Sequence, residues 1–159
     1  MPTVRIRSML LASLLLILCG SCPLVAQQTK ASEKPADTNG QFSEETAIRL
    51  LDQLLQGLQS HNEQEFLSSF DPQFMTNYGE FADQVDVFFT QYENFIGRYH
   101  VREGGNDPDH PAVLVQFDLE GQPVVSGAPF RKSAQVRFEF ARGKNGWKIV
   151  NLTPRGFFS

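Results

Sequence analysis

Apolar residues recur at three- and four-residue spacing through the first part of the chain. Between residues 43 and 60 this stripe consists of Ala47, Ile48, Leu51, Leu54, Leu55 and Leu58. Such spacing places the side chains on one face of an amphipathic helix. Ser43 precedes the stripe, and Glu44 and Glu45 follow at once, which is typical of a helix N-terminus because the hydroxyl and carboxylates favour its free N–H groups. The pattern therefore predicts a helix over residues 43–60.

Two more helices are predicted before the pattern changes. Asn62 with Glu65 three residues later forms a capping-box pattern, which indicates a second, short helix. This helix carries Phe66, Leu67 and Phe70. A third helix is predicted to begin near Asn77, with Glu80 at its capping-box position, and to end near Gly97. Its apolar face consists of Tyr78, Phe81, Val85, Phe88, Phe89 and Tyr92.

The period then changes from 3.6 to 2, which indicates strands. Strands are predicted over residues 98–103, 112–121, 133–142 and 147–154, with a short strand at Val124–Val125. The dipeptide Asn145-Gly146 predicts a hairpin between the last two, since Asn-Gly suits the tight turn of a hairpin. Three helices followed by antiparallel strands define an α+β class, with the helices on one face of the sheet.

The first residues of the chain have the layout of a secretory signal peptide. Arg5 and Arg7 precede an uncharged apolar run at residues 9–18, which is too short to span a bilayer as a permanent helix. We expect the signal peptide to occupy residues 1–26, with cleavage between Ala26 and Gln27. The mature protein is then exported, and it is either periplasmic or secreted.

An alternative is lipidation at Cys22. The tripeptide Gly20-Ser21-Cys22 resembles the end of a bacterial lipoprotein box, although Cys19 stands where that box usually has an aliphatic residue. The product would be an envelope component anchored by a lipid on Cys22. In either case the polar residues 27–42 predict a flexible linker, and the folded domain is predicted over residues 43–159.

Composition narrows the classes of partner. Both cysteines lie before residue 27, so cleavage after Ala26 leaves no disulfide to stabilise the domain. The net charge is −4, and loss of Arg5 and Arg7 with the signal peptide makes it −6. A mildly acidic chain without a basic cluster argues against nucleic acid or an anionic membrane as partner. The 14 phenylalanines predict a core of large, flat side chains.

The order of predicted elements resembles the NTF2-like superfamily, including its SnoaL-like and lumazine-binding-like members. The resemblance rests on the first helix, on NEQEFLSSF and YGEFADQVDVFFTQY at residues 62–70 and 78–92, and on the closing strand GWKIVNL. It covers residues 43–159 and implies a cone-shaped fold, in which three helices pack on a curved antiparallel sheet and enclose a pocket. Enzymes of the superfamily place an Asp and a His or Tyr in that pocket. No motif of any one enzyme subfamily is matched, so the resemblance assigns no catalytic residue.

The histidines do not predict a catalytic or metal site. His100 is in phase with Arg98 and Arg102, which places it on the outer face of its strand. His61 lies in a turn and His110 in a loop, and neither has a partner at metal-ligand spacing. We therefore expect no metal and no cofactor.

The polar aromatic residues are the remaining candidates for a ligand pocket. They are Tyr78, Tyr92, Tyr99 and Trp147. Their polar edges need partners when buried, and a cone lined by them would suit a small, largely apolar ligand. Aromatic residues at helical spacing are also typical of a core, so these four residues are either pocket wall or core.

These observations favour a non-catalytic module that binds a small apolar ligand or an envelope protein. The alternative is a SnoaL-like or ketosteroid-isomerase-like enzyme, which would use a carboxylate and a tyrosine inside the cone. The outer face of the predicted sheet is polar, which favours a monomer or a weak dimer. The residues on that face are Arg98, Arg102, Gln116, Gln135, Arg137, Glu139 and Lys148.

Overall fold

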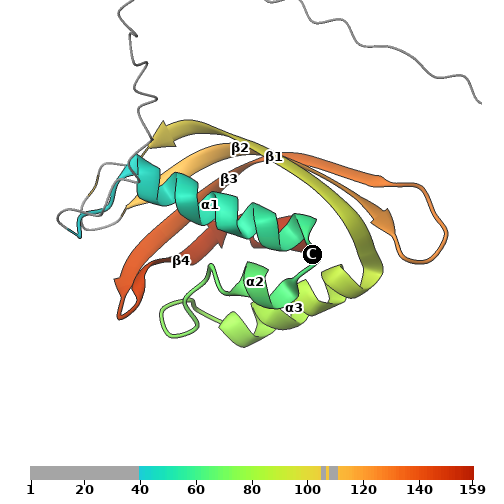
Figure 1. The fold of residues 1–159 in the computed structure, drawn as a ribbon, viewed down its shortest axis with the longest axis horizontal. Helices are drawn as coiled ribbons and strands as arrows, with labels where there is room; N and C mark the ends of the chain where they lie inside the picture. The colour runs from blue at the N-terminus through green and yellow to red at the C-terminus, as the bar shows by residue number, and fades with distance from the viewer. Residues whose placement is uncertain (1–39, 105–106, 108–110) are drawn as a thin grey trace, which may run out of the picture. The chain divides into compact units, whose positions relative to one another are not determined.

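The computed structural model describes residues 40–104, 107 and 111–159. The predicted signal peptide, Cys22 and nearly all of the predicted linker lie outside these residues. The helices are α1 (Glu44–Gln59), α2 (Glu63–Leu67), α3 (Tyr78–Gln91) and the 3-10 turn η1 (Arg155–Phe158). The strands are β1 (Tyr92–Gly104), β2 (Ala112–Pro123), β3 (Phe130–Gly143) and β4 (Gly146–Thr153). The strands form one antiparallel sheet in the order β1-β2-β3-β4, which curves over the helices (Figure 1). The predicted α+β class is confirmed.

Two of the three predicted helix starts are confirmed with their caps. The Ser43 hydroxyl accepts a hydrogen bond from the Thr46 amide at 3.2 Å, and Asn62 Oδ1 accepts one from the Glu65 amide at 3.0 Å. The third predicted cap is wrong, because the Asn77 side chain makes no capping hydrogen bond. Asn77 instead has a left-handed backbone with φ of 54°, so its side chain does not reach the free N–H groups of α3.

The end of α3 also differs from the prediction. The helix ends at Gln91, and β1 begins at Tyr92 without a loop between them. Gly97 therefore lies inside a strand, where it faces α1. A Cβ atom at this position would lie 2.3 Å from Leu55 Cδ1, so Gly97 permits the close approach of β1 to α1. The glycine marks a packing contact rather than a helix end.

The four long strands are confirmed: β1, β2 and β3 are longer than predicted, and β4 is shifted by one residue. The short strand is not formed. Val124 and Val125 lie in the loop after β2, where they are 54% and 79% exposed. The last hairpin is confirmed: Gly143 pairs with Gly146, and Lys144 and Asn145 form the turn.

Strand β4 is at one edge of the sheet, yet its free edge is covered in the middle. The Ile149 amide donates to the Ser69 carbonyl at 3.0 Å, and the Asp71 amide donates to the Ile149 carbonyl at 2.9 Å. The segment after α2 therefore adds a short parallel bridge between Phe70 and Ile149. This bridge satisfies backbone groups that an edge strand would otherwise expose.

Phenylalanine rings from the helices and the sheet fill the space between them. The largest of these side chains, each at most 1% exposed, are Phe66, Phe88, Phe117, Phe138 and Phe158. The rings of Phe66 and Phe117 lie 5.1 and 5.6 Å from that of Phe158, in edge-to-face arrangements. The C-terminal turn thus contributes directly to the core, and the concave face of the sheet is packed rather than open.

Candidate functional site

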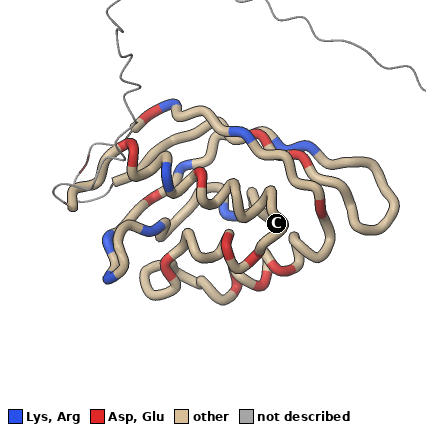
Figure 2. Tube along the Cα trace, viewed as in Figure 1, with Lys and Arg blue, Asp and Glu red and all other residues tan. Residues whose placement is uncertain are grey.

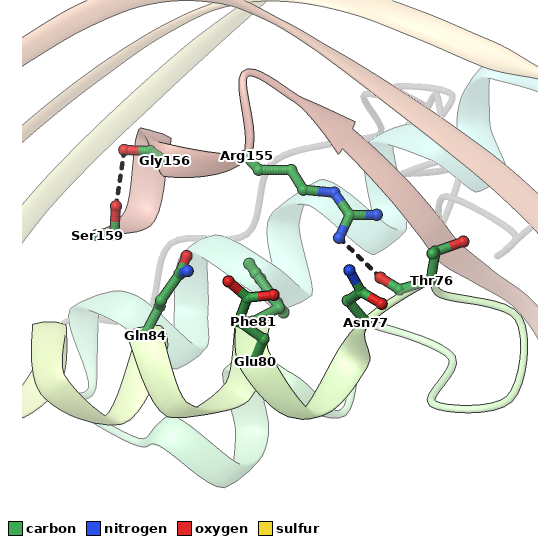
Figure 3. A pocket seen from close by; sticks show the side chains of 8 residues that line it. All are labelled: Thr76, Asn77, Glu80, Phe81, Gln84, Arg155, Gly156 and Ser159. Carbon is green, nitrogen blue, oxygen red and sulfur yellow. Dashed lines mark hydrogen bonds between the residues drawn. The ribbon is translucent and has the colours of Figure 1, made fainter.

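An open cleft of about 720 Å³ lies between the start of α3 and the C-terminal turn η1 (Figure 3). It is lined by Thr76, Asn77, Glu80, Phe81, Gln84, Arg155, Gly156 and Ser159. The cleft thus joins two segments that are far apart in sequence. Its volume falls in the range of about 300–1,000 Å³ that is usual for small-molecule sites.

Arg155 forms one wall of the cleft and is held from two sides. Its Nη1 donates to the Thr76 carbonyl at 2.7 Å, and its Nη2 donates to Asn151 Oδ1 at 3.3 Å. Asn151 in turn donates to Glu139 Oε2 at 3.2 Å, and Glu139 Oε1 accepts from Arg137 Nε at 3.3 Å. This chain of polar contacts runs from the segment before α3 across β4 and β3. It fixes the guanidinium group of Arg155 in position.

The opposite wall is supplied by α3. Glu80 and Gln84 are four residues apart on this helix, so they share one face, and both point toward the C-terminal segment (Figure 3). Within the described part of the chain, no hydrogen bond or ion pair engages the Glu80 carboxylate. Phe81 forms the apolar floor and is 3% exposed. The cleft therefore presents a carboxylate and a guanidinium group above an apolar base.

The four residues predicted for the pocket lie at separate places. Tyr78 begins α3 and Tyr92 follows its last residue, so about 20 Å of helix separates them. Tyr78 is half-buried near α2, where burial and the charge of Glu63 raise its pKa. The Tyr92 ring packs on Phe130 with centroids 4.6 Å apart. Neither tyrosine lines the cleft described above.

Tyr99 makes the one tyrosine–carboxylate contact among the described residues. Its hydroxyl donates to Asp52 Oδ1 at 2.6 Å, and its ring stacks on Phe117. Burial and this hydrogen bond raise the pKa of Tyr99 well above its ordinary value. Asp52 is exposed on α1, so the pair lies at the rim between α1 and β1 rather than inside the core.

Trp147 is half-buried at the start of β4. Phe42 covers it, with ring centroids 5.2 Å apart, and Phe42 also packs on Phe140 at 4.8 Å. The indole Nε1 is enclosed and has no hydrogen-bond partner. The last residue of the predicted linker thus packs on the domain, and the structure does not bring Trp147 into contact with the three tyrosines.

Lys132 is a charged residue of the inner face that the sequence analysis missed. Its ammonium group lies 5.2 Å from the ring centroid of Phe88 and donates to the carbonyls of Phe157 and Ser159. Burial lowers the pKa of Lys132. Period-two alternation could have found it, because Lys132 is in phase with the buried Val136 and Phe138.

The residues that the structure describes show neither a metal centre nor a helix fit to span a membrane. These hold no cluster of three or more His, Cys, Asp or Glu side chains fit for a metal ion. His61 has a structural role: its Nε2 donates to the carbonyls of Phe89 and Tyr92, both at 3.0 Å, at the end of α3. His100 is exposed. No described helix has the length and apolar character needed to cross a membrane.

The architecture matches solved structures of the NTF2-like fold. A ketosteroid isomerase-like protein from Erwinia carotovora atroseptica is 15% identical, with a TM-score of 0.55 over 70% of this chain and 95% of that chain. An NTF2-like superfamily protein from Salmonella enterica is 10% identical, with a TM-score of 0.54 over 68% and 86%. A hexachlorocyclohexane dehydrochlorinase is 17% identical, with a TM-score of 0.53 over 68% and 81%.

The chain therefore has the NTF2-like fold, as its sequence pattern predicts. No protein-family model matches the sequence, and no match was found among curated proteins. At these identities the similarity extends to the fold alone. Because proteins with this fold include enzymes, the fold does not decide between catalysis and binding.

Proposed function

We propose that this protein is an exported, non-catalytic binding module whose ligand site is the cleft between α3 and η1. The observation that carries the proposal is the contrast between the concave face of the sheet and this cleft. Ring side chains fill the concave face of the sheet, whereas the cleft holds an unpaired carboxylate opposite an anchored guanidinium group. A binding site requires accessible space with oriented polar groups, and the cleft offers both.

The alternative of an enzyme that works inside the cone receives less support. General acid–base catalysis needs titratable groups that can reach a substrate. The Tyr99–Asp52 pair lies at the rim, and the ammonium group of Lys132 is engaged by carbonyl groups of the C-terminal segment. A substrate on the concave face would have to displace packed rings such as Phe117 and Phe158.

The openness of the cleft and its charged walls also indicate the kind of ligand. A purely apolar ligand suits a dry, enclosed cavity, but the cleft is open and has charged groups on two walls. The cleft better fits a molecule with polar groups, either free or presented by an envelope protein.

Fragment screening by NMR tests where ligands bind. We expect small fragments to shift the backbone amide signals of residues 76–84 and 155–159. Gln84→Trp should abolish these shifts, because a large ring would fill the cleft that Gln84 lines. Gln135→Trp, at an exposed position of β3, is the matched control and should leave them unchanged. Fragments that instead shift the signals of Phe117 and Phe138 would place the site inside the cone and overturn the proposal.

The export part of the proposal rests on residues 1–26 and has its own test. Intact-mass measurement of protein purified from the membrane and soluble fractions of its host should give a chain that begins at Gln27. A mass that corresponds to a lipid-modified chain beginning at Cys22, and lost in Cys22→Ala, would replace this with the anchored alternative. A full-length chain that begins at Met1 would contradict both.

A further inference from the structure

Arg155 has hydrogen-bonding capacity that the fold does not use. A guanidinium group carries five N–H donors, and the described contacts occupy one on each terminal nitrogen, with the Thr76 carbonyl and Asn151 Oδ1 as acceptors. The remaining donors belong to a side chain that lines the cleft. Because the guanidinium fork matches the two oxygens of a carboxylate, Arg155 is suited to bind an anionic group of that shape.

Glu80 places a negative charge in the same cleft. The structure pairs its carboxylate with no other described residue, Arg155 included. A ligand that carried only an anion would gain from Arg155 but meet repulsion from Glu80. A ligand that carried only a cation would be attracted by Glu80 and repelled by Arg155. A ligand that carries both charges is therefore the one that both walls favour.

The base of the cleft can contact the uncharged part of such a ligand. Phe81 supplies an apolar floor, and Gly156 leaves the C-terminal wall without a side chain at that position. An apolar body can therefore lie between the two charged groups, and Gln84 offers an amide beside it.

We infer that the cleft binds a zwitterion with an apolar body, which is the chemistry of a free amino acid or a short peptide. The ammonium group would contact Glu80, the carboxylate would contact Arg155, and the apolar part would lie on Phe81. This inference rests on the proposed function, because it names the ligand class of the same cleft.

Titration with matched probes tests the inference. The probes are L-phenylalanine, 3-phenylpropanoate, which lacks the ammonium group, and 2-phenylethylamine, which lacks the carboxylate. The tripeptide Gly-Phe-Gly separates its two charges further, so it distinguishes a peptide site from an amino-acid site. By NMR shifts at residues 76–84 and 155–159, we expect one of the two zwitterions to bind at least about tenfold more tightly than either single-charge probe.

The Glu80→Gln variant distinguishes a ligand-binding role of Glu80 from a purely structural one. The variant should weaken binding of the zwitterion and of 2-phenylethylamine, yet strengthen binding of 3-phenylpropanoate, because the repulsive charge is gone. Glu80 is exposed, so the fold should tolerate the change. Asp83→Asn, an exposed position on α3 that does not line the cleft, is the control and should change none of the affinities.

The possible results distinguish a wrong zwitterion assignment from a wrong binding site. If fragments bind in the cleft but neither zwitterion is preferred, or if Glu80→Gln weakens all probes alike, the zwitterion assignment is wrong and the binding site stands. If no fragment and no probe shifts the cleft residues, both are wrong.

Discussion

At the scale of single residues, Trp147 shows how the fold uses its polar aromatic side chains. Its indole N–H is enclosed and has no acceptor. Among the described residues, Ser69 Oγ is the other buried side-chain N or O atom that has no hydrogen-bond partner. An unpaired buried donor costs stability, so hydrogen bonding does not hold Trp147 in place. Its contact with Phe42 does, which makes Trp147 a packing residue beneath the segment that precedes α1.

The Phe42→Ala variant tests this role. Phe42 is half-buried, so its truncation should lower the free energy of unfolding by about 1–2 kcal/mol, less than for a fully buried ring. Trp147 is the only tryptophan, and its fluorescence should shift to longer wavelength as water reaches the indole. Chemical denaturation and emission spectra measure the two effects. Gln41→Ala, at an exposed neighbour, is the control, and equal behaviour of both variants would contradict the packing role.

The raised pKa of Tyr99 predicts a pH dependence. Burial and the Asp52 hydrogen bond favour the neutral phenol in the folded state, so the folded pKa exceeds the unfolded value of about 10. The stabilisation is fully present below the unfolded pKa and is lost as pH rises above it. The free energy of unfolding of the wild type should therefore fall more steeply above pH 10 than that of Tyr99→Phe. Parallel pH curves for the two proteins would refute this.

At the scale of elements, the two confirmed caps should contribute measurably to stability. Ser43→Ala and Asn62→Ala each remove a hydrogen bond to a free N–H group, and each should cost about 1 kcal/mol in the free energy of unfolding.

Asn77→Gly should have the opposite effect on α3. The Asn77 side chain caps nothing and its φ is 54°, a conformation that glycine adopts without strain. We therefore expect the free energy of unfolding to stay equal or to rise slightly. A loss of 1 kcal/mol or more by urea denaturation would mean that Asn77 does cap the helix in solution.

The sequence predicts the elements of this fold where the determining signal is local. Ser43 and Asn62 lie beside the N–H groups they cap, so both helix starts could be identified. The predicted apolar stripe of the first helix includes Ile48 and omits Leu50, yet Leu50 is 5% exposed and Ile48 is 37% exposed. At about 100° per residue, Ile48 and Leu50 lie on opposite margins of the apolar stripe, and tertiary packing decides which margin is buried. The same holds for Gly97, whose role depends on Leu55 in another element.

The candidate site was harder to predict from the sequence than the fold. Glu80 and Arg155 are 75 residues apart, and no local pattern around either one indicates that they share a cleft. The tyrosines and Trp147 were singled out by their chemistry, but their positions depend on which ring packs on which. Only Lys132 carried a usable signal, in its phase along β3.

At the scale of the whole domain, charge is distributed unevenly. From residue 50 to residue 97 the chain has no Lys or Arg, and its acidic residues are Asp52, Glu63, Glu65, Asp71, Glu80, Asp83, Asp86 and Glu93. Acidic residues therefore predominate along α2 and α3, and most basic residues lie on the strands (Figure 2). The outer face of the sheet exposes Arg98, Arg102, Gln135 and Arg137. Such a face lacks the apolar centre of a stable dimer interface.

Sedimentation equilibrium tests the expected oligomeric state. We expect residues 40–159 to behave as a monomer, or to associate only weakly, at physiological salt and micromolar concentration. A tight dimer under these conditions would show that another surface outweighs the polar sheet face.

The central claim is that the inside of the cone is filled and that the ligand site lies outside it, in the cleft between α3 and η1. Binding of benzene, a small apolar probe, tests it most directly, since dry apolar cavities take up benzene whereas packed cores do not. Addition of benzene should leave the melting temperature of the wild type unchanged, and it should raise that of Phe138→Ala, in which a buried ring is removed. Stabilisation of the wild type by benzene, with NMR shifts at Phe117 and Phe138, would contradict the claim.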